Sequence, residues 1–255
     1  PDALISIQKD EVFNVAARAR GLAYFSLAPV KLGGRFLWSD NAFITSSAFL
    51  EAIRANLAAG LEALPPAADY HQEAGSKFNH ARLRYTWKRA LKETLQQVVK
   101  DGKSLVRGRF TKDSYPFLGW TPYLLRRPRI YRRFLRAGRR PADLAGRRAI
   151  YVPLHLEPEI ALLGISPEFN NSMEMIAWIS KAAPADTLLV VKEQPFSFGV
   201  RSWGYYRQLL QIPNVVLAHP ETMSWEWIKA TTVTATITGT AATEAVMFGR
   251  PVLSF

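Results

Sequence analysis

The chain has 255 residues, 48% of them hydrophobic, so it can form one large domain or two ordinary ones with their own cores. It contains no cysteine and no run near the ~20 apolar residues of a membrane-spanning helix, which excludes disulfides, thiolate catalysis and an obvious membrane span. The net charge is +12, and residues 76–148 hold 21 of the 33 Lys and Arg but four of the 21 acids, which predicts an anionic partner for this segment.

Residues 1–75 have a mixed α/β pattern. Short apolar runs predict strands, and helical spacing closed by Gly21 and by Gly60 predicts helices with glycine C-caps. The expected elements are strands at 4–7 and 22–27 and helices at 11–20 and 47–59.

Residues 76–148 are basic, and their apolar positions have helical spacing over 81–99. A second basic stretch, 122–140, interleaves arginines with aromatic and aliphatic residues, and Pro128 predicts either a break in it or the start of its main helix. Pro141 and Gly146 predict a linker after this stretch. We therefore predict two domains, 1–148 and 149–255, the first with a basic helical segment.

The arginines of the second basic stretch predict a binding surface for an anionic membrane or an acidic glycan. Nucleic acid is a third option, but no nucleic-acid-binding motif accompanies the arginines, so we expect no nucleic-acid partner. A solvated basic helix face without a partner is the alternative. The residues concerned are Arg126, Arg127, Arg129, Arg132, Arg133 and Arg136.

Residues 149–255 alternate regularly between apolar runs and helical segments, with Ser172 and Ser224 as expected N-caps. This alternation is typical of a doubly wound, mostly parallel sheet in an α/β domain. The expected strands lie at 149–154, 187–191, 214–218, 233–237 and 252–255, and the expected helices at 173–183, 203–211, 225–230 and 240–248.

Polar residues follow four of these strands. In open parallel sheets, ligands bind outside the carboxyl ends of the strands, so we expect these side chains to form one site. They are His155, Glu157 and Glu159 after the first strand, Lys192 and Gln194 after the second, His219 after the third, and Thr238, Gly239, Thr240 and Glu244 after the fourth.

The segment at 238–240, a glycine between two threonines before a helix, offers backbone N–H groups and the positive end of a helix dipole to an anion. Glu244 lies close behind it, where its carboxylate can accept hydrogen bonds from sugar hydroxyls. Lys192 can pair with a phosphate, with Glu193 orienting it. The alternatives are an ordinary threonine-capped helix and a solvated lysine at a strand end.

His155, Glu157 and Glu159 share one face if their segment is extended, and a His or Glu there can act as general base on an acceptor hydroxyl. The alternative is that the two glutamates are ordinary loop carboxylates. Three such ligands without a second cluster do not indicate a metal site, so we expect none.

Three motifs, in the same order and spacing, resemble those of capsule-polysaccharide biosynthesis proteins. Residues 151–159 resemble the family's "PLHxQPE", residues 191–195 its "VKEHP", and residues 237–252 its "TGTxxxEA…GkPV". The resemblance is specific over 149–255, looser over 1–75 and not visible over 76–148.

The resemblance implies a GT-B-like α/β architecture of two Rossmann-like domains with the active site in the cleft. It implies a glycosyltransferase that moves a sugar from a nucleotide-sugar donor, such as CMP-Kdo, to a capsule or other surface glycan or its lipid anchor. The place implied is the cytoplasmic face of the bacterial membrane, with no metal and no resident cofactor. By motif, Lys192 and the 238–240 turn hold the donor phosphate and Glu244 the ribose, while His155, Glu157 and Glu159 line the cleft.

The sequence departs from the family at three points. Gln194 stands where the family has His, and Glu157 where Gln is usual. The chain also stops at the strand over 252–255, where a GT-B enzyme continues, so we expect a fragment. Because Gln cannot carry a shuttled proton, two alternatives remain: a non-catalytic glycan- or membrane-binding assembly factor, or another GT-B enzyme such as a sugar-nucleotide epimerase or a polyol-phosphate polymerase.

Overall fold

The computed structural model describes residues 3–6, 11–29, 36–41, 47–60, 84–106, 121–157, 162, 166–169 and 171–255. The chain divides into two compact units, Pro1–Ser76 and Lys77–Phe255. This division differs from the boundary at 148/149 that the sequence pattern favours, because the helix Thr121–Ala137 packs on the C-terminal sheet and the helix Trp87–Val106 packs on that helix. Each unit is described by itself below.

The first unit contains a three-stranded sheet with the strand order β1-β2-β3. β1 pairs parallel with β2, and β2 pairs antiparallel with β3. The sequence predicted every one of these elements except β3. The elements are β1 (Ala3–Ser6), α1 (Glu11–Ala19), β2 (Ala23–Pro29), β3 (Phe36–Ser39) and α2 (Ser47–Ala58).

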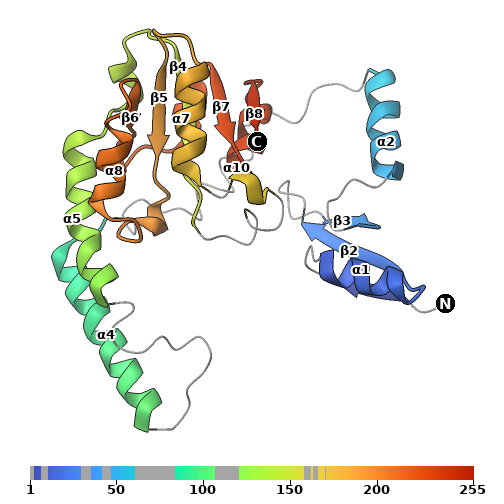
Figure 1. Ribbon diagram of the computed structural model, residues 1–255, viewed down its shortest axis with the longest axis horizontal. Coiled ribbons are helices and arrows are strands. Elements are labelled where there is room, and N and C mark those ends of the chain that lie inside the picture. The colour runs from blue at the N-terminus through green and yellow to red at the C-terminus, as the bar shows by residue number, and fades with distance from the viewer. Residues whose placement is uncertain are drawn as a thin grey trace. The chain divides into compact units, whose positions relative to one another are not determined.

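The second unit is built around a sheet of five parallel strands in the order β6-β5-β4-β7-β8 (Figure 1). The chain runs outward from β4 to β6 and then returns to the other side of β4, which confirms the doubly wound parallel sheet. Its elements are α4 (Trp87–Val106), α5 (Thr121–Ala137), η2 (Pro141–Leu144), β4 (Ala149–Pro153), η3 (Pro167–Phe169), α7 (Ser172–Ala182), β5 (Leu188–Lys192), η4 (Pro195–Ser197), α8 (Trp203–Leu209), β6 (Val215–Leu217), α9 (Ser224–Ala230), β7 (Val233–Thr236), α10 (Thr240–Met247) and β8 (Val252–Ser254).

Helices cover both faces of this sheet. In Figure 1, α7 and α8 lie in front of the strands, with α5 beside α8, and the buried side chains of these three helices form one core with Leu189 and Val191 of β5. The buried side chains of α9 and α10 form a second core with Leu188 and Val190. Successive residues of a strand point to opposite faces, so a strand covered on both sides is apolar throughout.

α5 runs through Pro128 without a break, so the break or helix start predicted there is wrong. The helix continues because its packing outweighs the lost backbone hydrogen bond. Ile130 and Phe134 are buried after the proline, and the Phe134 ring meets the rings of Phe198 and Tyr206 edge-on at 5.0 and 4.8 Å.

The segment after α5 is an ordered edge of the sheet and not the expected linker. Arg139 forms a parallel bridge with Ala218 just beyond β6, and its carbonyl accepts the N–H of His219 at 2.7 Å. The approach is so close that a Cβ on Gly138 would lie 2.7 Å from the Cα of His219. Leu144 of η2 is buried in the core under α9.

Two helix starts differ by one residue from the prediction. Asn171, and not Ser172, caps α7 through its side-chain oxygen, so Ser172 is the first helical residue. Ser224 is likewise the first residue of α9, and the Glu226 carboxylate accepts the N–H of Met223 at 2.7 Å.

Candidate functional site

The order in which the chain adds strands reverses between β4 and β7. The polar residues follow the carboxyl ends of the strands around this reversal point, and we call this side of the sheet its polar edge. His155 follows β4, Lys192 ends β5, and the 238–240 turn follows β7. His219 follows β6, the next strand outward. In a doubly wound sheet this reversal point is where ligands bind, so the convergence that the sequence predicts is present.

His155 spans the reversal point. Its Nε2 lies 3.1 Å from the Thr236 hydroxyl oxygen and 3.4 Å from the backbone nitrogen of Ile237, both from β7 or directly behind it. Burial lowers the pKa of His155; the nearby charge of Glu157 opposes that shift and the charge of Arg201 adds to it. The imidazole is therefore neutral near pH 7 and ties the ends of β4 and β7 together.

The 238–240 turn presents the start of α10 to solvent. Gly239 has φ +109° and ψ 179°, a conformation that only glycine adopts without strain, and no side chain caps the helix there. Gly239 and Thr240 are exposed, and a Cβ on Gly239 would lie 3.7 Å from the Cε1 atom of His155. First-turn N–H groups lack intrahelical acceptors, so the turn can donate to an anion beside the imidazole.

Lys192 is a buried cation on the α9–α10 face of the sheet. Only 6% of the residue is exposed, and in the part of the chain that the structure describes no carboxylate forms an ion pair with its ammonium group. Burial lowers its pKa to about 8, although the charges of Glu193 and Glu226 act in the opposite direction. A buried charge without a counter-ion is unfavourable, and a bound anion at this edge relieves that cost.

His219 is held by its own turn. Its Nδ1 accepts the N–H of Glu221 at 3.3 Å, and its Nε2 lies 3.4 Å from a guanidinium nitrogen of Arg140. Burial lowers its pKa, and the charges of Arg140 and Lys192 lower it further. His219 is therefore close enough to Lys192 to respond to its charge.

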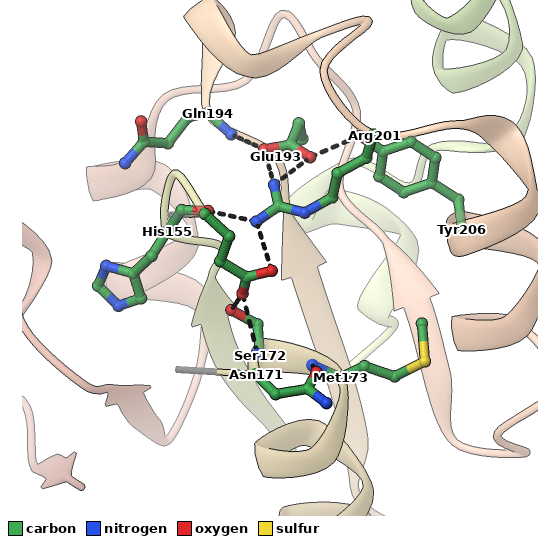
Figure 2. A network of polar contacts seen from close by, with 9 residues as sticks. His155, Asn171, Ser172, Met173, Glu193, Gln194, Arg201 and Tyr206 are labelled. Atoms are coloured by element: carbon green, nitrogen blue, oxygen red, sulfur yellow. Dashed lines mark hydrogen bonds and ion pairs between the residues drawn. The ribbon is translucent and has the colours of Figure 1, made fainter. Parts of the chain in front are cut away.

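Glu193 does not orient Lys192, because it points to the opposite face of the sheet. Its carboxylate receives two contacts from one Arg201 nitrogen, at 3.0 and 2.9 Å, and a hydrogen bond from the Tyr206 hydroxyl at 2.5 Å (Figure 2). The N–H of Gln194 also donates to it at 2.8 Å. Burial raises the pKa of Glu193, and Arg201 counteracts that rise.

Glu157 belongs to the same network. Its carboxylate accepts the N–H of Ser172 at 2.9 Å and the Ser172 hydroxyl, and it lies 3.4 Å from Arg201. Arg201 also donates to the carbonyl of His155. The side chains of His155 and Glu157 therefore have separate hydrogen-bond partners, Thr236 for the imidazole and Ser172 for the carboxylate. Glu159 lies outside the described residues.

Gln194 and Glu244 flank the edge. In Figure 2 the side-chain amide of Gln194 and the ring of His155 point to the same side, away from Arg201. Glu244 is partly exposed on α10, and its charge adds to the effect of burial in raising the pKa of Tyr151. Its carboxylate is thus near the Tyr151 hydroxyl, on the α10 face of the sheet.

The arginines of α5 fall into two groups. The side chain of Arg127 is only 11% exposed and faces inward, so it is not part of an exposed basic surface. Two of the others lie over tryptophan rings, Arg129 over Trp87 and Arg133 over Trp203. The exposed residues are Arg126, Arg129, Arg132, Arg133 and Arg136.

Sequence reasoning missed Arg201, Tyr206 and Ser172. The signal was Glu193, because an acid directly after a fully buried strand needs a cation and further hydrogen-bond donors. Nothing in the pattern distinguishes Arg201 from other nearby cations as that partner.

Among the residue ranges that the structure describes, no group of three or more His, Asp or Glu is arranged to hold a metal ion. Within the same ranges, no helix combines the length and the apolar character needed to cross a bilayer.

No protein-family model matches the chain, and no curated protein matches it. Among solved structures, it is similar to a KpsC of Thermosulfurimonas dismutans described as a beta Kdo 2,7 transferase, with 19% identity, a TM-score of 0.36, and coverage of 61% of this chain and 46% of that one. A second KpsC from the same organism, a beta Kdo 2,4 transferase, has 17% identity, a TM-score of 0.35, and coverage of 43% and 34%. The chain thus spans less than half the length of either transferase.

Proposed function

We propose that the second unit is the donor-binding part of a glycosyltransferase that transfers a sugar from a nucleotide-sugar to a capsule or other surface glycan. The observation that carries this proposal is Lys192, a buried cation without a described counter-ion, at the same sheet edge as the 238–240 turn. The motif resemblance supplies the class of reaction and suggests CMP-Kdo as donor.

In this mechanism the donor phosphate lies between the Lys192 ammonium group and the N–H groups at the start of α10. The departing nucleotide carries increasing negative charge as its bond to the sugar breaks, and both groups stabilise that charge. The rigid strand end and helix start also hold the donor in place for attack by an acceptor hydroxyl. The phosphate charge is met by the protein itself, without a resident cofactor.

The other predicted residues have distinct roles in this proposal. His155, neutral near pH 7, lines the donor site and has the protonation state that a base for the acceptor hydroxyl needs. Glu244 binds the ribose, and Gln194 hydrogen-bonds the phosphate or sugar. Glu157 positions the loop after β4, and Glu159 remains a lining residue on the motif resemblance alone.

Calorimetric titration with CMP, CDP, UDP, GDP and orthophosphate tests the site. We expect one nucleotide to bind, and Lys192→Met to weaken its binding about tenfold or more, as loss of a charged contact to phosphate does. Lys181→Met, which removes an exposed lysine from α7, is the matched control and keeps the wild-type affinity. Equal nucleotide affinity in Lys192→Met and wild type would contradict the assignment.

A transfer assay with the bound nucleotide's sugar derivatives separates the functions. Transfer that depends on Lys192 supports a glycosyltransferase. Nucleotide binding without transfer favours an assembly factor that retains the fold, and a changed donor sugar without transfer favours an epimerase.

We also propose that this chain works at an anionic membrane surface, the inner face of the bacterial cytoplasmic membrane. Two features support it. The five exposed arginines of α5 supply positive charge, and α4 exposes an apolar stripe beside lysines, a combination suited to anionic lipid. The stripe consists of Leu91, Leu95, Val98 and Val99, exposed by 60, 66, 38 and 48%.

Sedimentation with phosphatidylglycerol and with phosphatidylcholine vesicles tests this partner. We expect binding to the anionic vesicles only, lost in Leu91→Ser/Leu95→Ser and weakened in Arg132→Gln/Arg136→Gln. Binding of an acidic polysaccharide, with no binding to either vesicle, would show that the arginine surface binds the glycan acceptor. This result would contradict the membrane assignment.

A further inference from the structure

The loop between β5 and α8, residues 193–202, is held from the side of α5 by Arg127. The Nε of Arg127 donates to the carbonyl of Phe198 at 3.1 Å, and a terminal nitrogen donates to the carbonyl of Phe196 at 3.3 Å. The same side chain donates to the Tyr85 hydroxyl at 3.0 Å. One guanidinium therefore bridges two loop carbonyls and the segment before α4.

The guanidinium is enclosed by aromatic rings. Its central carbon lies 4.2 Å from the ring centre of Tyr85 and 4.8 Å from that of Tyr123, and one nitrogen lies 3.5 Å from the Glu93 carboxylate. With 11% of the side chain exposed, Arg127 is unlike the five exposed arginines of the same helix. Lysine cannot replace it, because lysine lacks the planar fork that reaches several acceptors at once.

The two tyrosines reinforce the contact. The Tyr85 hydroxyl donates to the carbonyl of Pro195 at 2.8 Å, and the Tyr123 hydroxyl donates to the carbonyl of Phe196 at 2.9 Å. Three loop carbonyls thus have partners in or just before the α4–α5 helices, and the short helix η4 is fixed against them.

Gly199 allows the loop to come this close. It has φ +92°, and a Cβ there would lie 2.6 Å from the Cγ of Arg127 and 2.9 Å from the carbonyl oxygen of Tyr123. Any side chain at this position would push the loop off α5.

The opposite side of the loop is fixed by the Glu193–Arg201 pair described above. Lys192 and Gln194 stand on either side of Glu193, so both anchors act on the two residues assigned to donor binding. Arg201 holds the loop at its start, at Glu193, and Arg127 holds it three and five residues further on, at Phe196 and Phe198.

We propose that Arg127 is a positioning residue: it fixes the β5–α8 loop and thereby the placement of Lys192 and Gln194. It touches neither donor nor acceptor. The consequence for nucleotide binding rests on the proposed function, whereas the clamp on the loop does not.

Hydrogen–deuterium exchange of the ligand-free protein tests the clamp. The amides of Ser197 and Val200 donate to loop carbonyls, so they report opening of the loop. In Arg127→Gln we expect their exchange to be about tenfold faster or more, since a charged multi-point contact is lost. Arg132→Gln, the same change at an exposed position of α5, leaves it unchanged.

Nucleotide titration then tests the positioning role. We expect weaker binding in Arg127→Gln and in Arg127→Lys, but wild-type affinity in Ile130→Val, which destabilises α5 in the core and removes no polar contact to the loop. If Arg127→Gln does not fold, Tyr123→Phe removes one loop contact and is expected to give a smaller change in the same direction.

The outcomes are separable. Unchanged loop exchange in Arg127→Gln, or in Tyr123→Phe where it substitutes, overturns the clamp. Faster exchange with unchanged nucleotide affinity overturns the positioning role. If the wild type binds no nucleotide, the proposed function fails and the exchange experiment still decides the clamp.

Discussion

Lys192 and Glu193 are neighbours in the chain, yet their side chains lie on opposite faces of the sheet and differ in whether their charges are paired. On the α7–α8 face, Glu193 is fully buried and meets Arg201, Tyr206 and a backbone N–H. On the α9–α10 face, Lys192 is almost as deeply buried and has no ion-pair partner among the described residues.

The difference separates a structural charge from one available to a ligand. A buried carboxylate whose acceptors are satisfied fixes the loop and contributes to a unique fold. A buried ammonium group without a counter-ion lowers stability and gains from a bound anion. The following predictions test that contrast, starting with the largest expected effect.

Arg201→Met removes the cation that pairs with the buried Glu193 carboxylate. It leaves Glu193 buried without its cation, so we expect the free energy of unfolding to fall by about 3–5 kcal/mol. Urea denaturation measures this, with Arg207→Met, an exposed arginine of α8, as the matched control. A loss no larger than that of the control would show that the pair is not structural.

Lys192→Met removes the buried charge that has no ion-pair partner among the described residues. Because burial holds its pKa near 8, below its ordinary 10.5, we expect this variant to be more stable than wild type at pH 7, by about 1–3 kcal/mol. Urea denaturation without ligand measures it. A less stable Lys192→Met protein would mean that Lys192 has a stabilising partner.

Gly239→Ala tests the other half of the site. Its φ of +109° makes alanine strained, so we expect a loss of about 1–3 kcal/mol in the free energy of unfolding together with weaker nucleotide binding. Gly146→Ala, also at positive φ but far along the chain in an exposed turn, is the control. The Gly146→Ala variant is expected to lose stability and keep the nucleotide affinity. If both variants lose nucleotide affinity to the same extent, the 238–240 turn is not part of the binding site.

The pH dependence gives the smallest and most specific effect. Between pH values of about 8 and 10.5 the unfolded chain holds the Lys192 proton more often than the folded one, so the contribution of Lys192 to stability rises with pH. Anion binding needs the charged form, so affinity falls about tenfold at one pH unit above the pKa. Comparing wild type with Lys192→Met across this range isolates both trends; parallel profiles would refute them.

Much of the second unit was readable from the sequence. The apolar runs at β4, β5 and β7 and the polar residues that follow them predicted a parallel sheet with a polar edge, because strand burial and strand direction leave a direct pattern in the chain. The same logic identified Lys192 and the 238–240 turn as candidates. It missed the boundary at residue 76 and the helix through Pro128, since both depend on what the basic segment packs against.

The sequence by itself therefore determined the parallel, doubly wound sheet and the polar residues at the carboxyl ends of its strands, and it predicted two candidate anion-binding elements. All of these follow from local periodicity and residue type. Only the tertiary structure decided which charges are satisfied. Arg127 has the same local sequence pattern as Arg132, yet Arg127 holds the carbonyl of Phe198. Glu157 has the pattern of an ordinary loop acid, yet its carboxylate contacts Ser172 and Arg201. Partners so distant in sequence leave no periodic signal, because they are chosen by the packing of helices on the sheet.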